Sequence, residues 1–322
     1  MNEQTVPQTI LQAVSHTVSL RDHVGKTLCR FGEDERIFVL DSDLAKSTTS
    51  IEFFKKYPDR FVELGIAEQS AVSVASGLAM EGKIAFYVNF SIFVTGTAWT
   101  QLRQACYANL NVKLIGTHPG MDNGPDGATH HANEDIACAR VIPNLMVLVP
   151  ASLEELEEAI RIAIEHEGPV YIRTARDAVP ADVPPRECKP GKARILYDDG
   201  DDAAIIFEGT AAKLAYESYQ ALKEQGFRCK LINVFSIKPL DTDLIGKTAD
   251  AVRGIVTVEN HSIVGGLGSA VAEALSMRNT RPRLAMVGVA DCFTESGKTA
   301  ELKSKYGLNV ANVVDHVKRV IE

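Results

Sequence analysis

The 322-residue sequence lacks several features that mark specialised classes of protein. Its six cysteines are scattered and include no C-x-x-C pair, which argues against a zinc site and favours reduced thiols over disulfides. Lysine and arginine form no stripe, and the net charge is -8. A nucleic-acid partner is therefore not expected, because phosphate backbones bind clustered basic residues.

Long apolar runs are missing too. No run approaches the ~20 residues that a membrane span needs, and the polar N-terminus MNEQTVPQTI lacks the regions of a signal peptide. We therefore expect a cytoplasmic protein without a membrane partner. Its 45% hydrophobic and 24% charged residues are typical of a soluble globular chain, and its length favours two domains.

Common catalytic motifs are absent as well. The sequence contains no P-loop, no G-x-S-x-G nucleophile elbow, and no GDG segment followed at a distance by Asn. The segment GGLGSAVAEAL, residues 265–275, looks like a phosphate-binding turn but does not fit G-x-G-x-x-G. We predict a tight, closely packed turn there instead.

Short apolar runs alternate with helical patterns in the first half of the chain. The runs that predict strands buried on both faces are 36–43, 83–90, 112–118 and 145–152. Helices are expected between them, and Ser152 is the expected cap of the last one. The alternation predicts a parallel α/β sheet. Ligands of such sheets bind at the carboxyl ends of the strands, so the loops there are the places to search.

A Pro-rich stretch of irregular composition, residues 178–193, separates this series from a second α/β series. We place the boundary near residue 186. The expected fold is α/β with two domains, 1–186 and 187–322, each a mostly parallel sheet covered by helices.

The loop GTHPGMDNGPDGATHH, residues 116–131, is unusually polar for a segment that follows a buried strand. It contains His118, Asp122, Asp126, His130 and His131. A solvated Gly-rich loop is one interpretation, and a metal site is a weaker one, because no helical ligand spacing is present. The third is a sugar site, where imidazoles and a carboxylate bind hydroxyls and transfer protons near neutral pH.

Two aromatic residues, Phe90 and Phe93, end a predicted strand close to this loop in the expected fold. Ordinary core packing explains such a pair. The same two rings could also form a stacking wall for a flat heterocycle. These two residues alone do not distinguish core packing from a ligand-binding wall, so the neighbouring motifs are needed.

The segments FVELGIAEQ, NFSIF, GPDGATHH and IPNLMVLVPAS together resemble the C-terminal half of a transketolase, the thiamine-diphosphate enzyme that moves two-carbon ketol units between sugars. The resemblance continues through PVYIR, IKPLD and HSIVGGLGSAVAEAL, and so covers nearly the whole chain. It implies a pyrimidine-binding domain over 1–186 and a transketolase C-terminal domain over 187–322.

The resemblance also implies cofactor-binding residues. Glu68 matches the acid that shares a proton with the aminopyrimidine ring of thiamine diphosphate, although a helix dipole alone would also favour an acid there. Phe90 and Phe93 match the wall against that ring, and Asp43 matches an acid near the cofactor. Gly96 stands where transketolases often carry a further aromatic residue.

Substrate-binding residues are implied in the same way. His130 resembles the histidine that moves protons near the reacting carbon, and Asp126 the carboxylate that binds a sugar hydroxyl. The positions that match a sugar-phosphate site are Arg21, Ser47, His118 and Arg176. Guanidinium groups suit that role through bidentate geometry, although an exposed arginine is more often a solvated surface charge.

The missing GDG motif implies a partner. A separate N-terminal subunit would hold the diphosphate and Mg²⁺ or another divalent cation, and two copies of each chain are expected. Alternatives are a deoxyxylulose-phosphate synthase, the beta subunit of a 2-oxo acid dehydrogenase, or a homologue that binds without catalysis. The donor and acceptor sugars, whether phosphorylated, sulfonated or branched, stay open.

Overall fold

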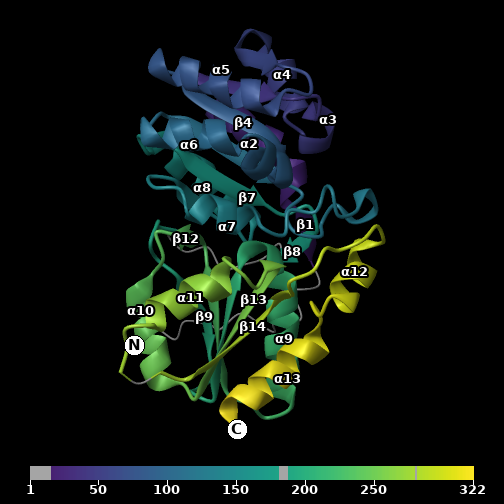
Figure 1. Ribbon diagram of the computed structural model, residues 1–322, viewed down its shortest axis with the longest axis vertical. Helices are drawn as coiled ribbons and strands as arrows, with labels where there is room; N and C mark the ends of the chain where they lie inside the picture. Colours follow the sequence, from purple (N-terminus) through teal and green to yellow (C-terminus); the bar gives the residue numbers. More distant parts are fainter. Residues whose placement is uncertain (1–15, 181–187, 280) are drawn as a thin grey trace.

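The computed structural model describes residues 16–180, 188–279 and 281–322, and Figure 1 shows two α/β units stacked along the long axis of the molecule. The two predicted mostly parallel sheets are confirmed. The predicted boundary between residues 186 and 187 lies outside the described residues. None of the helices in the described segments is long and apolar enough to cross a membrane.

The first sheet has seven strands in the order β12-β6-β7-β5-β4-β2-β3. In chain order the strands are β2 (Ile37–Asp41), β3 (Phe61–Glu63), β4 (Ile84–Phe90), β5 (Val112–Thr117), β6 (Met146–Leu148), β7 (Val170–Thr174) and β12 (Ser236–Lys238). All neighbours are parallel except β12, which runs antiparallel to β6. The edge strand β12 comes from the second half of the chain, which the sequence did not predict.

Helices cover both faces of this sheet, which explains why every residue of β4 is buried. One face packs against α5 (Glu68–Met80), α6 (Trp99–Tyr107) and α7 (Asp135–Arg140). The other packs against α2 (Val24–Phe31), α4 (Ile51–Lys56) and α8 (Leu153–Glu165), and the short α3 (Ala45–Thr48) precedes α4. The predicted cap of α8 is confirmed, because Ser152 Oγ accepts the Glu155 N–H at 3.2 Å.

The second sheet has the order β14-β13-β10-β11-β9, with only β9 antiparallel to its neighbour. Its strands are β9 (Arg194–Asp198), β10 (Ala203–Glu208), β11 (Cys229–Val234), β13 (Gly254–Ser262) and β14 (Arg283–Val289). The helices of this half are α9 (Ala212–Glu224), α10 (Thr242–Ala251), α11 (Leu267–Leu275), α12 (Thr299–Lys305) and α13 (Val310–Ile321). In Figure 1, α12 lies at the junction with the first domain.

The predicted tight turn at 265–275 is confirmed, and its packing explains why no phosphate belongs there. A Cβ on Gly266 would lie 1.9 Å from Glu259 Oε2, so only glycine fits. The Glu259 carboxylate accepts the first N–H groups of α11, from Leu267 at 2.7 Å and Gly268 at 2.9 Å. A protein carboxylate therefore occupies the anion-binding end of this helix.

The interpretation of 178–193 as wholly irregular was wrong at its beginning. Strand β8 (Ala178–Pro180) pairs antiparallel with β1 (Thr17–Ser19), in the register Thr17 to Pro180. The proline lies at the end of a two-stranded edge ladder, where its missing N–H is tolerated. Local composition does not reveal a partner that is so distant in sequence.

A buried network of ion pairs and hydrogen bonds joins the two domains. Arg173 of β7 is fully buried and pairs with Asp135 at 2.7 Å and with Glu208 of the second domain at 3.3 Å. Its guanidinium also donates to the Asn260 carbonyl at 2.8 Å. Because a buried charge without its partner is strongly destabilising, this network fixes the second domain against the edge of the first sheet.

Candidate active site

The carboxyl ends of five adjacent strands line one edge of the first sheet. Along that edge the order β7, β5, β4, β2, β3 leads into Arg176, His118, Phe90, Asp43 and Glu68. The register pairs Thr117 with both Phe90 and Thr174, so neighbouring strands end level with one another. The topology thus arranges five of the candidate residues in a row at the place where such sheets bind ligands.

An aromatic cluster occupies the middle of this row. The rings of Phe90 and Phe93 lie 6.0 Å apart and nearly parallel, at 13°. His118 lies 4.0 Å from Phe90, and His130 meets Phe93 edge-on at 5.4 Å. The structure therefore brings the two phenylalanines and two of the loop histidines together in a cluster of the kind that packs against a flat ring.

A π-helical turn, Phe93–Thr97, sets the position of Phe93. Single π-turns are rare and occur often at functional sites. Gly96 is exposed within this turn, so no third ring extends the wall there. The Gln69 side chain donates to the Thr97 carbonyl at 3.3 Å and ties the start of α5 to the same turn.

Glu68 is the first residue of α5, and only 9% of it is exposed. Within the described residues its carboxyl group has no hydrogen-bond partner. The preceding turn is shaped by Gly65, which has a φ of 65° and donates its N–H to Glu63 Oε1 at 2.8 Å. The result is a mostly buried acid at a helix N-terminus whose carboxyl group is available to an external donor or acceptor.

Asp43 lies in the loop after β2 and is exposed. Its N–H donates to Glu63 Oε1 at 2.8 Å, so one glutamate ties together the loops after β2 and β3. Asp43 and His118 both have left-handed backbones, with φ of 61° and 56°. Non-glycine residues in this region are uncommon and tend to occur at functional sites.

The four candidates for anion binding also converge. Arg21 Nη1 donates to the Ser47 carbonyl at 3.0 Å, and the Arg21 N–H donates to the Ala175 carbonyl, beside Arg176, at 2.9 Å. Arg21 Nε is buried and has no hydrogen-bond partner among the described residues. Burial and the charges of Arg176 and Arg21 lower the pKa of His118 to about 3. His118 is therefore a neutral imidazole that is affected by the charges of both arginines.

The remaining loop residues differ in their surroundings. His130 is half-buried, with Nδ1 3.0 Å from Thr129 Oγ1, and Asp126 is exposed at the end of a short 3-10 turn. No hydrogen bond joins Asp126 to the other candidates within the described part of the chain. His131 points into the domain junction, where its Nδ1 lies 2.6 Å from Thr294 Oγ1. No cluster of metal-ligating residues occurs within the described segments.

Two buried polar groups that support the site were not predicted. Asn89 Oδ1 accepts the Phe90 N–H at 2.6 Å, and its amide donates to the Tyr87 hydroxyl at 2.8 Å. Asp41 accepts hydrogen bonds from Leu44, Thr48 and Ser50 and so shapes the loop that carries Asp43 and Ser47. The available signal was a polar residue inside an apolar strand pattern, since such residues need buried partners.

Burial raises the pKa of Asp41 to about 6, against the hydrogen bonds from Leu44, Ser50 and Thr48, which lower it. The group is fully buried at the end of β2. Its role is therefore to hold the loop in place rather than to contact a ligand.

Comparison with known proteins matches both halves of the chain. The family "Transketolase, pyrimidine binding domain" matches residues 16–181, and "Transketolase, C-terminal domain" matches residues 191–313. The chain is 40% identical over 308 residues to the protein named "Putative transketolase C-terminal section" of Methanocaldococcus jannaschii, which covers 94% of this chain and 95% of that one.

Two further likenesses are as extensive. The chain is 37% identical over 306 residues to the 6-deoxy-6-sulfo-D-fructose transketolase subunit SqwH of Clostridium sp. strain MSTE9, with 94% of each chain covered. A solved structure described as "Split gene transketolase, inactive beta4 tetramer" superposes with a TM-score of 0.86 at 40% identity. That likeness covers 94% of this chain and 98% of the other.

Proposed function

The chain belongs to the transketolase family and corresponds to the C-terminal subunit of a split transketolase-type enzyme, and we propose that it transfers a two-carbon ketol unit from a ketose to an aldose together with a separate N-terminal subunit. The row of residues from Arg176 to Glu68 carries this proposal. It offers an anion site at one end and an acid for a ring nitrogen at the other, with aromatic rings between them. The named relatives do not favour the other families or a silent homologue.

The cofactor of the proposed enzyme is thiamine diphosphate. When bound, it supplies the carbon nucleophile of ketol transfer. The site chemistry fits its aminopyrimidine, because Glu68 is mostly buried and lacks a partner within the described residues, and Phe90 and Phe93 form a pair of nearly parallel rings at the same edge of the sheet. Glu68 would hold a proton at the ring nitrogen, and Asp43 lies in the adjoining loop. The diphosphate and Mg²⁺ or another divalent cation belong to the partner subunit.

The substrate of this proposal is a sugar with a terminal anion. Arg21 and Arg176 supply the positive charge, the neutral imidazole of His118 donates a hydrogen bond, and the Ser47 segment lies beside Arg21. A phosphate and a sulfonate share this tetrahedral, anionic chemistry, and one relative is named for a sulfonated sugar. Nearer the reacting carbon, His130 moves a proton and Asp126 accepts a hydrogen bond from a hydroxyl.

The assembly of this proposal has two copies of each chain. The solved relative described as an inactive tetramer of one chain type supports the need for a partner. A cytoplasmic location and a domain boundary near residue 186 stay predictions.

The test is reconstitution with a candidate N-terminal subunit. The mixed complex should transfer ketol units and bind thiamine diphosphate with Mg²⁺, whereas the isolated chain should be inactive and bind the cofactor weakly in calorimetry. Diphosphate and metal contacts should account for most of the affinity, so their absence explains both deficits. Tight, magnesium-dependent binding by the isolated chain would refute the split-enzyme proposal.

A further inference from the structure

Asp122 accepts three hydrogen bonds from Arg176 and its neighbour Asp177. Its fully buried carboxylate accepts the backbone N–H groups of Arg176 at 3.0 Å and of Asp177 at 2.9 Å, both through Oδ2. Its carbonyl oxygen accepts Arg176 Nη1 at 2.9 Å. The direction in which the Arg176 guanidinium leaves the end of β7 therefore depends on where Asp122 lies.

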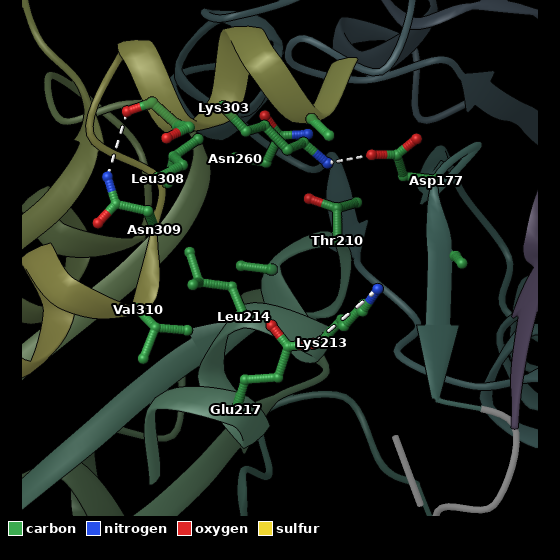
Figure 2. A pocket seen from close by; sticks show the side chains of 14 residues that line it. Asp177, Thr210, Lys213, Leu214, Glu217, Asn260, Lys303, Leu308, Asn309 and Val310 are labelled. Atoms are coloured by element: carbon green, nitrogen blue, oxygen red, sulfur yellow. Dashed lines mark hydrogen bonds and ion pairs between the residues drawn. The ribbon is translucent and has the colours of Figure 1, made fainter. Parts of the chain in front are cut away.

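Asp122 in turn depends on the second domain. Lys303 of α12, 181 residues further along the chain, donates to Asp122 Oδ1 at 2.9 Å and to Asp177 Oδ2 at 2.7 Å. Figure 2 shows the ammonium group of Lys303 turned towards Asp177. The Asn260 amide adds a bond to Asp122 Oδ1 at 2.8 Å. One lysine thus bridges two carboxylates, that of Asp122, which accepts the Arg176 backbone N–H, and that of Asp177, which directly follows Arg176 in the chain.

We propose that Lys303 is a positioning residue for the terminal anion of the substrate, and that it acts on Arg176 by fixing Asp122, which accepts the Arg176 N–H, and Asp177, the next residue in the chain. The inference rests on the proposed function, because it presupposes that Arg176 binds that anion. Lys303 itself contacts no reacting group in this proposal. The second domain thereby contributes to substrate affinity from outside the site.

The charge balance explains why Lys303 matters. A carboxylate with no exposed surface is costly unless it is paired. Burial alone would raise the pKa of Asp122, but Lys303 and the N–H groups of Asp177 and Arg176 lower it below its usual value. Without the ammonium group, Asp122 would have to take up a proton or turn away, and either change weakens its hold on the Arg176 backbone.

The surroundings of Lys303 permit a conservative replacement. A cavity of about 310 Å³ lies beside the bridge and is lined by Thr210, Asn260 and Lys303, among others (Figure 2). It gives a longer side chain room to bend, so an arginine could keep both ion pairs. Lys305 of the same helix is a matched control, because it is exposed and its ion pair is with Glu295.

The experiment uses the complex with the N-terminal subunit. The donors are fructose 6-phosphate and 6-deoxy-6-sulfofructose, each compared with fructose. For whichever anionic donor the complex accepts, Lys303→Met should raise KM about tenfold and keep kcat within about twofold of the wild-type value. The kcat/KM for fructose should be unchanged. Lys303→Arg should restore most of the affinity, and Lys305→Met should behave as wild type.

A double variant separates this inference from the proposed function. If Lys303 acts through Arg176, adding Lys303→Met to Arg176→Ala should raise KM no further. If Arg176→Ala selectively weakens the anionic donor while Lys303→Met does not, the inference fails and the proposed function stands. If Arg176→Ala affects all donors equally, the role of Arg176 is wrong and the inference fails with it.

Two other outcomes are decisive. An equal loss for anionic and neutral donors in Lys303→Met would mean a merely structural lysine and would overturn the inference. If Lys303→Met does not assemble, Asp177→Asn takes its place, because it removes one of the two bridges at a partly exposed position. A smaller but selective rise in KM is then expected, and an unchanged KM would refute the proposal.

Discussion

Replacing Glu68 by glutamine separates activation of the cofactor from folding and assembly. Glutamine keeps the size and hydrogen-bonding capacity of the side chain and removes its acidic proton. With 9% of the residue exposed and no partner within the described residues, the change breaks no hydrogen bond that the fold uses. The expected effect is therefore on proton transfer to the ring nitrogen alone.

The two possible roles of Glu68 differ in magnitude. An acid in the first turn of a helix contributes ~0.3–1 kcal/mol through the helix dipole. Loss of an acid or base catalyst lowers the rate by roughly two to four powers of ten, which corresponds to about 2.7–5.4 kcal/mol of transition-state stabilisation. A variant that keeps its stability within ~1 kcal/mol but loses at least a hundredfold in rate can only have lost the catalytic role.

The assay follows exchange of the proton on the reactive thiazolium carbon, by NMR, in the assembled complex without sugar. Glu68→Gln should slow this exchange together with ketol transfer for every donor and acceptor. Glu81→Gln, at the exposed end of the same helix, is the matched control and should exchange as wild type. A wild-type exchange rate in the Glu68→Gln complex would show that the acid has another purpose.

Three further predictions test other parts of the site. Arg176→Ala should raise KM for an anionic donor far more than it lowers kcat and should barely affect fructose; an equal loss for both would contradict the anion assignment. The isolated chain should show no ketol transfer until the N-terminal subunit is added, and steady turnover without it would contradict the assembly. Because the pKa of Asp41 is raised to about 6, its stabilising effect is full below pH ~4 and is lost as the pH rises through 6. In chemical denaturation the free energy of unfolding of wild type relative to Asp41→Asn should fall by up to ~3 kcal/mol across that window, whereas parallel profiles would refute the shift.

The sequence predicts the elements of this protein well because its strands are short apolar runs with local signals at their ends. The cap at Ser152 and the strands that became β2, β4 and β5 are examples, since each depends on neighbours within a few residues. The order of the candidate residues along the sheet edge could not be predicted from such local signals. It depends on strand order, which local patterns do not encode.

Some parts of the site escaped prediction because their signals are not local. Asp41 is a single acid at the end of an apolar strand, and its sequence does not show which three donors it binds. The left-handed backbones of Asp43 and His118 are not at glycines, so the sequence does not indicate them either. Strand β8 was missed for the same reason, because its partner β1 lies at the other end of the first domain. Resemblance to a family predicted Asp43 and His118 as site residues, but it did not describe the contacts that hold them in position.

The contacts that join the two domains were the least visible in the sequence, and they link the second domain to the candidate site on the first. Strand β12 of the second half of the chain extends the first sheet. Glu208 forms an ion pair with Arg173, and Lys303 forms one with Asp122. Each buried charge would lose a partner if the domains separated, and such losses cost several kcal/mol apiece. The domains therefore stabilise one another through buried charges, and one of these pairs, Lys303 with Asp122, also holds the backbone of Arg176. A substitution at the junction should consequently change substrate affinity without touching the substrate, because Asp122 cannot move without moving the backbone of Arg176.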